Sequence, residues 1–281
     1  MNDYDTRQQA FPVEKRNKGL PDNKPWLNVL LFVLTFLSTW LTQGVSYAVA
    51  IMTILLAHEM GHYIQARRYN VSATLPYFIP FPLLNPFGTL GAVIQMRGTI
   101  PNRRALFDIG ATGPLSGFVF TVPITILGIY LSEIIAVKQV SEYAMTLGDS
   151  LLFKGLVYWI KGPLPEGHDL FLHPVAYAGW AGFFVTALNL LPVGQLDGGH
   201  VIYSVLGKKA KYAYYVFLVA LGLLTLFYPL WTLLFVLLLF FGRRHPPPQN
   251  DEIRLDTKRK VLVILVWLIF ITSFIPFPFK L

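Results

Sequence analysis

The sequence predicts a polytopic, all-α membrane protein with six or seven transmembrane helices and a short reentrant, β-like insert between the second and third. Two observations carry this prediction. Of the 281 residues, 54% are hydrophobic and only 14% are charged, whereas a soluble domain usually has about 25% charged residues. The apolar residues also form long runs, and mean hydropathy is +0.52. This pattern excludes a disordered chain, a collagen, a coiled coil and an ordinary soluble enzyme.

The apolar runs divide the chain into spans, because a helix needs about 20 apolar residues to cross the hydrocarbon core. We expect a cytoplasmic N-terminal segment at 1–25, a core at 26–211 and further membrane helices at 212–281. Within the core, the expected spans are about 26–42, 45–65, 105–131 and 171–192. Because proline interrupts a helix, the run after 211 divides at Tyr228-Pro229, giving expected spans at about 212–227, 229–242 and 261–279.

The basic residues predict the orientation. With a cytoplasmic N-terminus, 19 of the 23 Lys and Arg residues fall on the inner side, the excess that cytoplasmic loops carry. The net charge of +8 therefore indicates orientation in a lipid bilayer, and we expect no nucleic acid partner. The leading residues do not resemble a cleaved signal or transit peptide, which favours a bacterial or archaeal plasma membrane over an organelle. The sequence assigns no oligomeric state.

Two segments between the spans are not simple loops. Residues 75–96 are apolar but contain four prolines, so they do not form a spanning helix. Their tail from Thr89 to Met96 fits an extended conformation, and non-helical backbone at membrane depth is tolerated only against protein or a water-filled cavity. We therefore predict a reentrant insert here. Residues 149–161 place lysines among aromatic residues, as in a helix that lies in the membrane interface.

The second span contains a metal-binding pattern. His58-Glu59-Met60-Gly61-His62 matches HExxH. Residues four apart share one face of a helix, so the two imidazoles can bind one metal ion, with Glu59 beside them as a base. The alternative is a pair of core histidines hydrogen-bonded to neighbouring helices. A charged side chain inside a span costs at least about 2–3 kcal/mol without a partner or purpose, which favours the metal site.

A zinc site needs a third protein ligand, and Asp197 is the candidate. The chain has no cysteine, so only His, Asp or Glu can complete the site. The predicted topology places Asp197 at the inner end of the fourth span, near the same leaflet as the two histidines. Asp-Gly is also a strong turn signal, and a purely structural turn at Asp197 is the alternative.

These motifs resemble those of the site-2 protease family of intramembrane zinc metalloproteases. The resemblance covers residue 45 to about 205 and rests on HEMGH, on GPLSG in the third span and on NLLPVGQLDGG in the fourth. The sequence PFGTLGAVIQMRGTIPNR is similar to the bacterial and plastid branch typified by the EGY proteases. The resemblance implies that Zn²⁺ is bound by His58, His62 and Asp197 and that Glu59 is the general base. It also implies that Asn189, with Pro192, helps to position the site or its substrate.

The expected function is therefore that of an intramembrane zinc endopeptidase. It would hydrolyse a peptide bond in or near a transmembrane segment of a membrane-anchored protein substrate, as in regulated intramembrane proteolysis. Zinc lowers the pKa of its bound water toward about 7, and Glu59 accepts the water proton. The alternative is a transporter or ion pathway that uses intramembrane His, Glu and Asp, although the repeated halves common in transporters are not seen.

A helical substrate hides its backbone from attack, so the insert has a candidate role. An edge strand can pair with an unwound substrate segment, and the residues proposed for it are Gly88, Thr89, Leu90, Gly91, Ala92 and Val93. The alternative is a hairpin that only seals the cavity.

For each of three further polar residues, the sequence allows two interpretations. Asn189 either steadies the developing oxyanion or a ligand, or makes an interhelical hydrogen bond. Asp108 either caps the third span or orients a ligand. His200 either supports the site or lies at a polar helix interface. Close helix packing is the expected role of the small residues of the third span, Gly110, Gly113, Pro114 and Gly117.

Overall fold

The structure is a computed structural model that describes residues 24–83, 85–137, 146–242 and 245–280. Its α-helices are α1 (Pro25–Gln43), α2 (Val45–Arg68), α3 (Arg103–Leu131), α4 (Leu151–Lys161), α5 (Pro174–Asn189), α6 (Asp197–Leu206), α7 (Ala210–Phe227), α8 (Thr232–Phe241) and α9 (Thr257–Ser273). Two 3-10 turns are η3 (Gly207–Lys209) and η4 (Pro229–Trp231). The strands are β1 (Ser72–Ala73), β2 (Tyr77–Pro80), β3 (Thr89–Val93), β4 (Met96–Arg97), β5 (Glu133–Ala136), β6 (Thr146–Leu147), β7 (His168–Phe171) and β8 (Phe279–Lys280).

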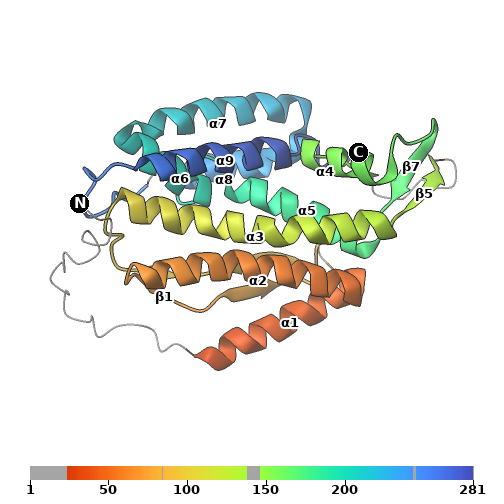
Figure 1. Cartoon of the computed structure of the whole chain (residues 1–281), viewed down its shortest axis with the longest axis horizontal. Helices are drawn as coiled ribbons and strands as arrows, with labels where there is room; N and C mark the ends of the chain where they lie inside the picture. The colour runs from red at the N-terminus through yellow and green to blue at the C-terminus, as the bar shows by residue number, and fades with distance from the viewer. Residues whose placement is uncertain (1–23, 84, 138–145, 243–244, 281) are drawn as a thin grey trace.

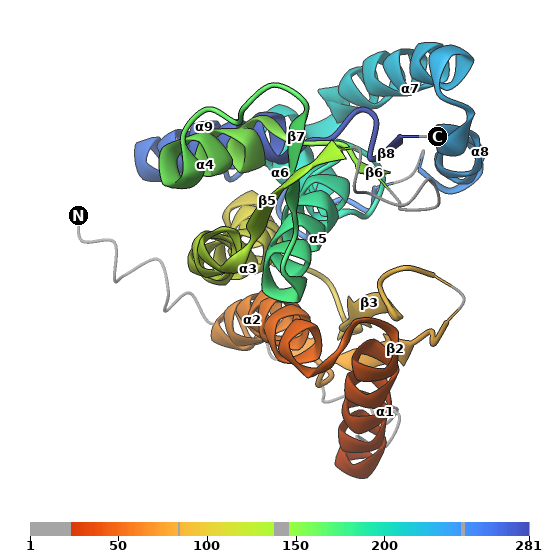
Figure 2. The same cartoon turned by 90° about the vertical axis from the view of Figure 1, so that its right-hand side faces the viewer.

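Helices α2, α3 and α5 form the centre of the molecule (Figure 2). They approach closely because small residues face one another. A Cβ added to Gly128 of α3 would meet the backbone of Ala176, and one added to Gly182 of α5 would lie 2.9 Å from the Thr121 side chain. Small residues at such crossings let helix backbones pack tightly in a membrane protein. The three helices therefore form a rigid frame for the side chains that α2 and α3 present to each other.

Helix α1 packs on the β2–β3 hairpin and on α2 (Figure 2). Gly44 joins α1 to α2 with a φ of 87°, a conformation that side chains with a Cβ rarely adopt. Asn28 Nδ2 donates to the carbonyls of Leu75 at 3.1 Å and Pro76 at 2.9 Å. Ser38 Oγ donates to the Gly88 carbonyl at 2.5 Å. The hydrogen bonds tie both ends of the hairpin to one helix.

The predicted extended stretch from Thr89 to Met96 is confirmed. Strand β3 pairs antiparallel with β2, with Tyr77 opposite Val93 and Phe78 opposite Ala92, and the register is irregular before Pro80. Proline lacks the N–H that a regular ladder requires. Strand β4 pairs with β1 in a second two-stranded sheet. Two further pairs, β5 with β7 and β6 with β8, were not anticipated, because strands of two to four residues leave little periodicity in the sequence.

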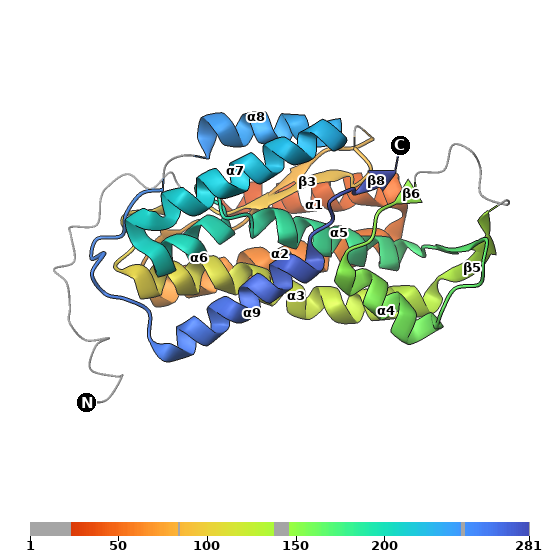
Figure 3. The same cartoon turned by 90° about the horizontal axis from the view of Figure 1, so that it is seen from above.

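The C-terminal helices cover one side of this frame (Figure 3). The predicted break at Tyr228-Pro229 is confirmed: α7 ends at Phe227, η4 begins at Pro229, and α8 packs back against α7. The last helix differs from its predicted range of about 261–279, since α9 begins at Thr257 and ends at Ser273. Its start is set by Asp256, whose side chain accepts from the Arg259 N–H, and the prolines that follow prevent its continuation.

The helix expected at about 171–192 is also shorter, and α5 runs from Pro174 to Asn189. Residues 168–171 pair as β7 instead, and Pro192 follows the end of α5. By length and composition, three segments among the described residues qualify to cross a membrane: Pro25–Gln43, Arg103–Leu131 and Asp197–Phe227. The chain is therefore a mostly helical membrane protein. The predicted segment 1–25 lies outside the described residues as far as residue 23.

Candidate metal centre

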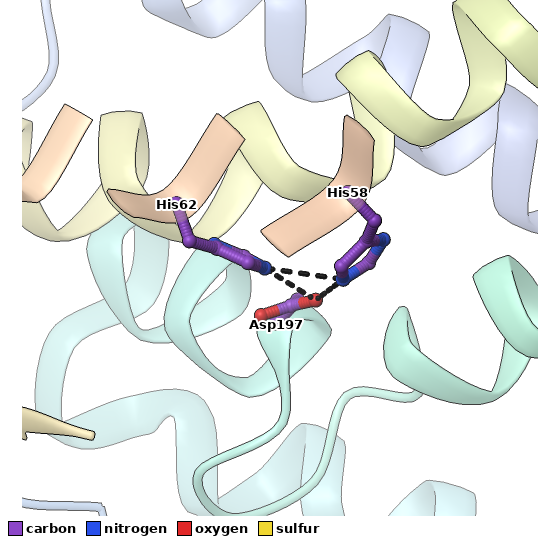
Figure 4. Close-up of side chains that lie close together, drawn as sticks. All are labelled: His58, His62 and Asp197. Carbon is purple, nitrogen blue, oxygen red and sulfur yellow. Dashed lines mark hydrogen bonds and ion pairs between the residues drawn. The ribbon is translucent and has the colours of Figure 1, made fainter. Parts of the chain in front are cut away.

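Three side chains from two distant parts of the chain meet at one point between α2 and α6 (Figure 4). His58 and His62 lie one turn apart on the same face of α2, and their Nε2 atoms are 3.2 Å apart. Asp197, the first residue of α6, places Oδ2 3.3 Å from each of these nitrogens. The histidines are buried at 6% exposure each. The structure thus brings together the three ligands expected from the sequence.

The triangle has the dimensions of one face of a tetrahedral zinc site. Zinc binds His nitrogen and carboxylate oxygen at about 2.0–2.2 Å, so neighbouring ligand atoms in a tetrahedron lie about 3.3–3.5 Å apart. The three ligand-atom separations are 3.2, 3.3 and 3.3 Å. Two imidazoles and one carboxylate are ordinary zinc donors, and they leave a fourth position for water or substrate. The donor set therefore fits zinc.

A hydrogen bond orients the His62 imidazole. His62 Nδ1 lies 2.7 Å from the Ile109 carbonyl of α3, so Nδ1 carries the proton and Nε2 presents its lone pair to the other ligands. Such a partner for the distal nitrogen is typical of metal-binding histidines. Asn189 Nδ2, at the end of α5, lies 3.3 Å from His58 Nε2. Asn189 therefore borders the cluster.

The glycines of α3 make room for the histidines. A Cβ at Gly113 would overlap the His62 imidazole, and one at Gly117 would lie 3.2 Å from His58 Cβ. A Cβ at Gly110 would lie 2.7 Å from His200 Cβ. Close packing, rather than contact with substrate, is thus what these glycines provide. The sequence showed the pattern of small residues but not which side chain each one faces.

Glu59 is buried beside the cluster at 7% exposure. Its carboxylate interacts electrostatically with His62 and Asp197, and it lies close to the backbone of Ile94. Ile94 directly follows β3. The β2–β3 hairpin therefore ends beside the glutamate of the HExxH motif, a proximity that no local pattern in the sequence indicates.

With this geometry established, the comparisons with known proteins identify the family. Residues 46–227 match Peptidase family M50, a range that contains all three ligands and Glu59. The chain belongs to this family. The resemblance to the site-2 proteases drawn from the motifs is thereby confirmed.

Similar curated proteins are plant proteins named as probable zinc metalloproteases. Arabidopsis thaliana EGY1, chloroplastic, is 33% identical over 235 residues, which are 82% of this chain and 42% of that protein. Arabidopsis thaliana EGY2, chloroplastic, is 30% identical over 243 residues, 85% of this chain and 43% of that protein. Rice (Oryza sativa subsp. japonica) EGY1 is 32% identical over 246 residues, 85% of this chain and 42% of that protein. The chain thus spans less than half the length of these relatives. No solved structure matches it.

Some predicted positions do not join the cluster. The prediction that Asp108 caps the third span is wrong, because α3 begins earlier, at Arg103. Its N-cap is Asn102, whose side chain accepts from the Ala105 N–H at 3.0 Å. Asp108 instead binds Arg259 of α9 through Nε at 2.8 Å and Nη2 at 2.6 Å. Pro192 lies in the turn between α5 and α6 and lines a separate cavity.

His200 was expected either to support the site or to lie at a polar interface. Its Nδ1 lies 2.7 Å from Nε2 of His245, in the connection between α8 and α9. The Tyr203 ring stacks on His245, with centroids 4.4 Å apart. A histidine at a polar interface, the second interpretation of His200, accounts for its contact with His245. The sequence does not indicate this contact, since a lone histidine next to prolines, such as His245, carries no distinctive pattern.

Proposed function

We propose that the protein is an intramembrane zinc endopeptidase that hydrolyses a peptide bond in or near a transmembrane segment of a membrane-anchored protein. The observation that carries this proposal is the buried triangle of His58, His62 and Asp197, with the HExxH glutamate beside it. Membership of the M50 family supports the same reaction. Neither the site nor the family favours the transporter alternative.

Each residue of the site has a proposed role. His58, His62 and Asp197 would hold zinc, which when bound polarises the scissile carbonyl and lowers the pKa of a coordinated water. Glu59 accepts the proton of the attacking water and returns it to the leaving amine. Asn189, whose Nδ2 lies 3.3 Å from His58 Nε2, borders the site, and its amide would be a donor toward the reacting carbonyl when zinc occupies that nitrogen. The turn at Pro192 holds Asn189 and Asp197 at its two ends.

The β2–β3 hairpin is proposed to hold the unwound substrate. Strand β3 has no partner other than β2 among the described residues, so one of its edges is open to strand addition. Leu90 and Val93 are 59% and 50% exposed. The proximity of Ile94 to Glu59 supports this role, because the end of the strand would then lie beside the proposed catalytic glutamate. A substrate strand paired with β3 would therefore pass the site in an extended, cleavable form.

We also propose six or seven spans, with the N-terminus and the active site toward the cytoplasm. The ends of α2 and α6 and the starts of α3, α7 and α9 gather at one end of the molecule (Figure 1). The basic residues predicted on the inner side flank these helix ends, which agrees with the positive-inside rule. A bacterial or archaeal plasma membrane remains a prediction from the sequence, whereas the relatives above are named as chloroplastic.

The test is cleavage of a single-span substrate by the purified protein in vesicles. Glu59→Gln should lower the cleavage rate by at least about 100-fold, because general-base catalysis contributes 10²–10⁴-fold. It should leave bound zinc unchanged, since Glu59 is outside the ligand triangle. Asp197→Asn should lower both zinc content and cleavage.

The matched control is Glu166→Gln, which removes an exposed glutamate far along the chain from the motif. This variant should cleave at the wild-type rate. Undiminished cleavage by Glu59→Gln would disprove the base assignment, and wild-type zinc content in Asp197→Asn would disprove the ligand assignment. If the wild-type protein moved zinc into vesicles but cleaved no substrate, the result would support the transporter alternative instead.

A further inference from the structure

A cavity of about 280 Å³ lies next to the turn that carries the proposed metal ligand Asp197. One wall is formed by Pro192 and Gly194 of that turn and by Gly199 in the first turn of α6. A Cβ at Gly199 would overlap the Gly194 carbonyl, so the wall is closely packed. None of the roles proposed above uses this cavity.

The rest of the lining carries positive charge. Lys208 of η3 and Lys211 in the first turn of α7 both line the cavity. His245 and Tyr203 line it as well. Burial lowers the pKa of His245, so the two lysines supply the charge at neutral pH and His245 supplies a hydrogen-bonding group. Among the residues that the structure describes, no acidic side chain lines the cavity. The cavity therefore favours an anion.

The cavity is lined by Ala210, Lys211 and Tyr214 at the start of α7, where α7 enters the proposed membrane span. Tyr212 and Tyr215, in the first two turns of α7, are 60% and 44% exposed, and tyrosines gather at the level of lipid headgroups. Lys211 Nζ lies 5.2 Å from the centre of the Tyr212 ring. Beyond these residues α7 is apolar, with exposed Val216 and Val219 that suit an acyl chain. Phospholipid phosphates are the anionic groups found at headgroup depth.

We propose that this cavity binds the phosphate headgroup of an anionic membrane phospholipid, with its acyl chains along α7. Basic pockets between membrane helices on the cytoplasmic side commonly hold such headgroups. Because Pro192, Gly194 and Gly199 form one wall, the bound headgroup packs against the segment that carries Asp197. The lipid thereby stabilises the turn on which the third metal ligand depends.

The test measures binding of phosphatidylglycerol to the purified protein held in nanodiscs of neutral phosphatidylcholine. The double variant Lys208→Gln/Lys211→Gln should weaken binding roughly 10-fold or more, because each lysine near the headgroup contributes about a factor of five. Ile202→Trp, which fills the cavity from α6 and leaves both lysines in place, should weaken binding to a similar extent. Zinc content and melting temperature without the anionic lipid check that each variant folds.

The matched control is Lys258→Gln/Lys260→Gln, which removes two exposed lysines at the start of α9 that do not line the cavity. It should change binding less than about two-fold. Equal weakening by both lysine pairs, or wild-type binding by folded Ile202→Trp, would show diffuse surface attraction and overturn the proposal. Competition by free glycerol phosphate at matched phosphate concentration would assign the site to a soluble phosphate and overturn the lipid assignment.

Discussion

At the scale of single residues, the metal centre depends on the lack of a Cβ atom at Gly113. Gly113 faces His62 so closely that a Cβ there would overlap the imidazole. Because His62 is also held through Nδ1 by the Ile109 carbonyl, the ring has no alternative position that keeps Nε2 in the triangle. We predict that Gly113→Ala lowers zinc affinity about 10- to 100-fold, the cost typical of disturbing the groups that orient a metal ligand. Competition with a chelator, followed by metal analysis, measures this change.

The control for that substitution is Gly155→Ala in α4, where an added Cβ meets nothing within 4 Å. This variant should retain wild-type zinc affinity. Wild-type affinity in Gly113→Ala would mean that α2 and α3 separate easily, which contradicts the close packing described here.

The residues of the motif were predictable because their chemistry is local. Two histidines and a glutamate within five residues of one helix share a face whatever the rest of the fold is. Asp197 was predictable only as a candidate, because 135 positions separate it from His62 and its Asp-Gly context equally fits a turn. The structure shows that Asp197 does both: it begins α6 after a turn and also meets the histidines.

At the scale of elements, an ion pair joins three helices. Asp108 of α3 accepts two hydrogen bonds from Arg259 of α9 and one from Tyr69, which follows α2, at 2.5 Å. Burial and this bond to Asp108 raise the pKa of Tyr69 to about 12, so the phenol remains a donor at physiological pH. The Asp108 and Arg259 side chains are 13% and 24% exposed. The pair therefore holds the start of α9 against the helices that carry the site.

We predict a coupling energy of roughly 0.5–3 kcal/mol between Asp108→Asn and Arg259→Gln in a double-mutant cycle of unfolding free energies. Paired charges with this little exposure are only weakly screened by solvent. The comparison cycle uses Asp108→Asn with Lys260→Gln, an exposed neighbour of Arg259, and should give a coupling near zero. Equal couplings in the two cycles would show that the effect is not specific to the bidentate pair.

A second prediction at this scale concerns β3. A photoreactive side chain introduced at Leu90 in the Glu59→Gln background should cross-link to a single-span substrate. Leu90 is 59% exposed on the strand proposed to pair with substrate. The same group at Val119, 66% exposed on α3, should capture lipid and little substrate. Cross-linking of equal yield at both positions would contradict the strand-pairing role and favour a hairpin that only seals the site.

At the scale of the whole molecule, the absence of cysteine makes the topology directly testable. Each introduced cysteine is unique, so a membrane-impermeant maleimide reports one position at a time. Cysteines replacing Lys211 or Lys258 should be labelled only from the side proposed to be cytoplasmic, because these residues lie at the helix ends flanked by basic residues. A cysteine replacing Lys154 of α4 should be labelled only from the other side. Labelling of all three from one side would exclude the proposed orientation.

The sequence by itself determined the class of protein, the break at Tyr228-Pro229, the extended segment after Gly88, and the candidate site residues of α2. These features depend on composition and on residues close together in the chain, through helical periodicity and the missing N–H of proline. The tertiary structure decided that Asp197 closes the triangle, that Gly113 makes room for His62, that Ile94 lies close to Glu59 and that Asp108 binds Arg259 instead of capping a helix. Each of these depends on which faces of two distant helices or strands meet. That choice is made by packing over the whole chain, and no local pattern encodes it.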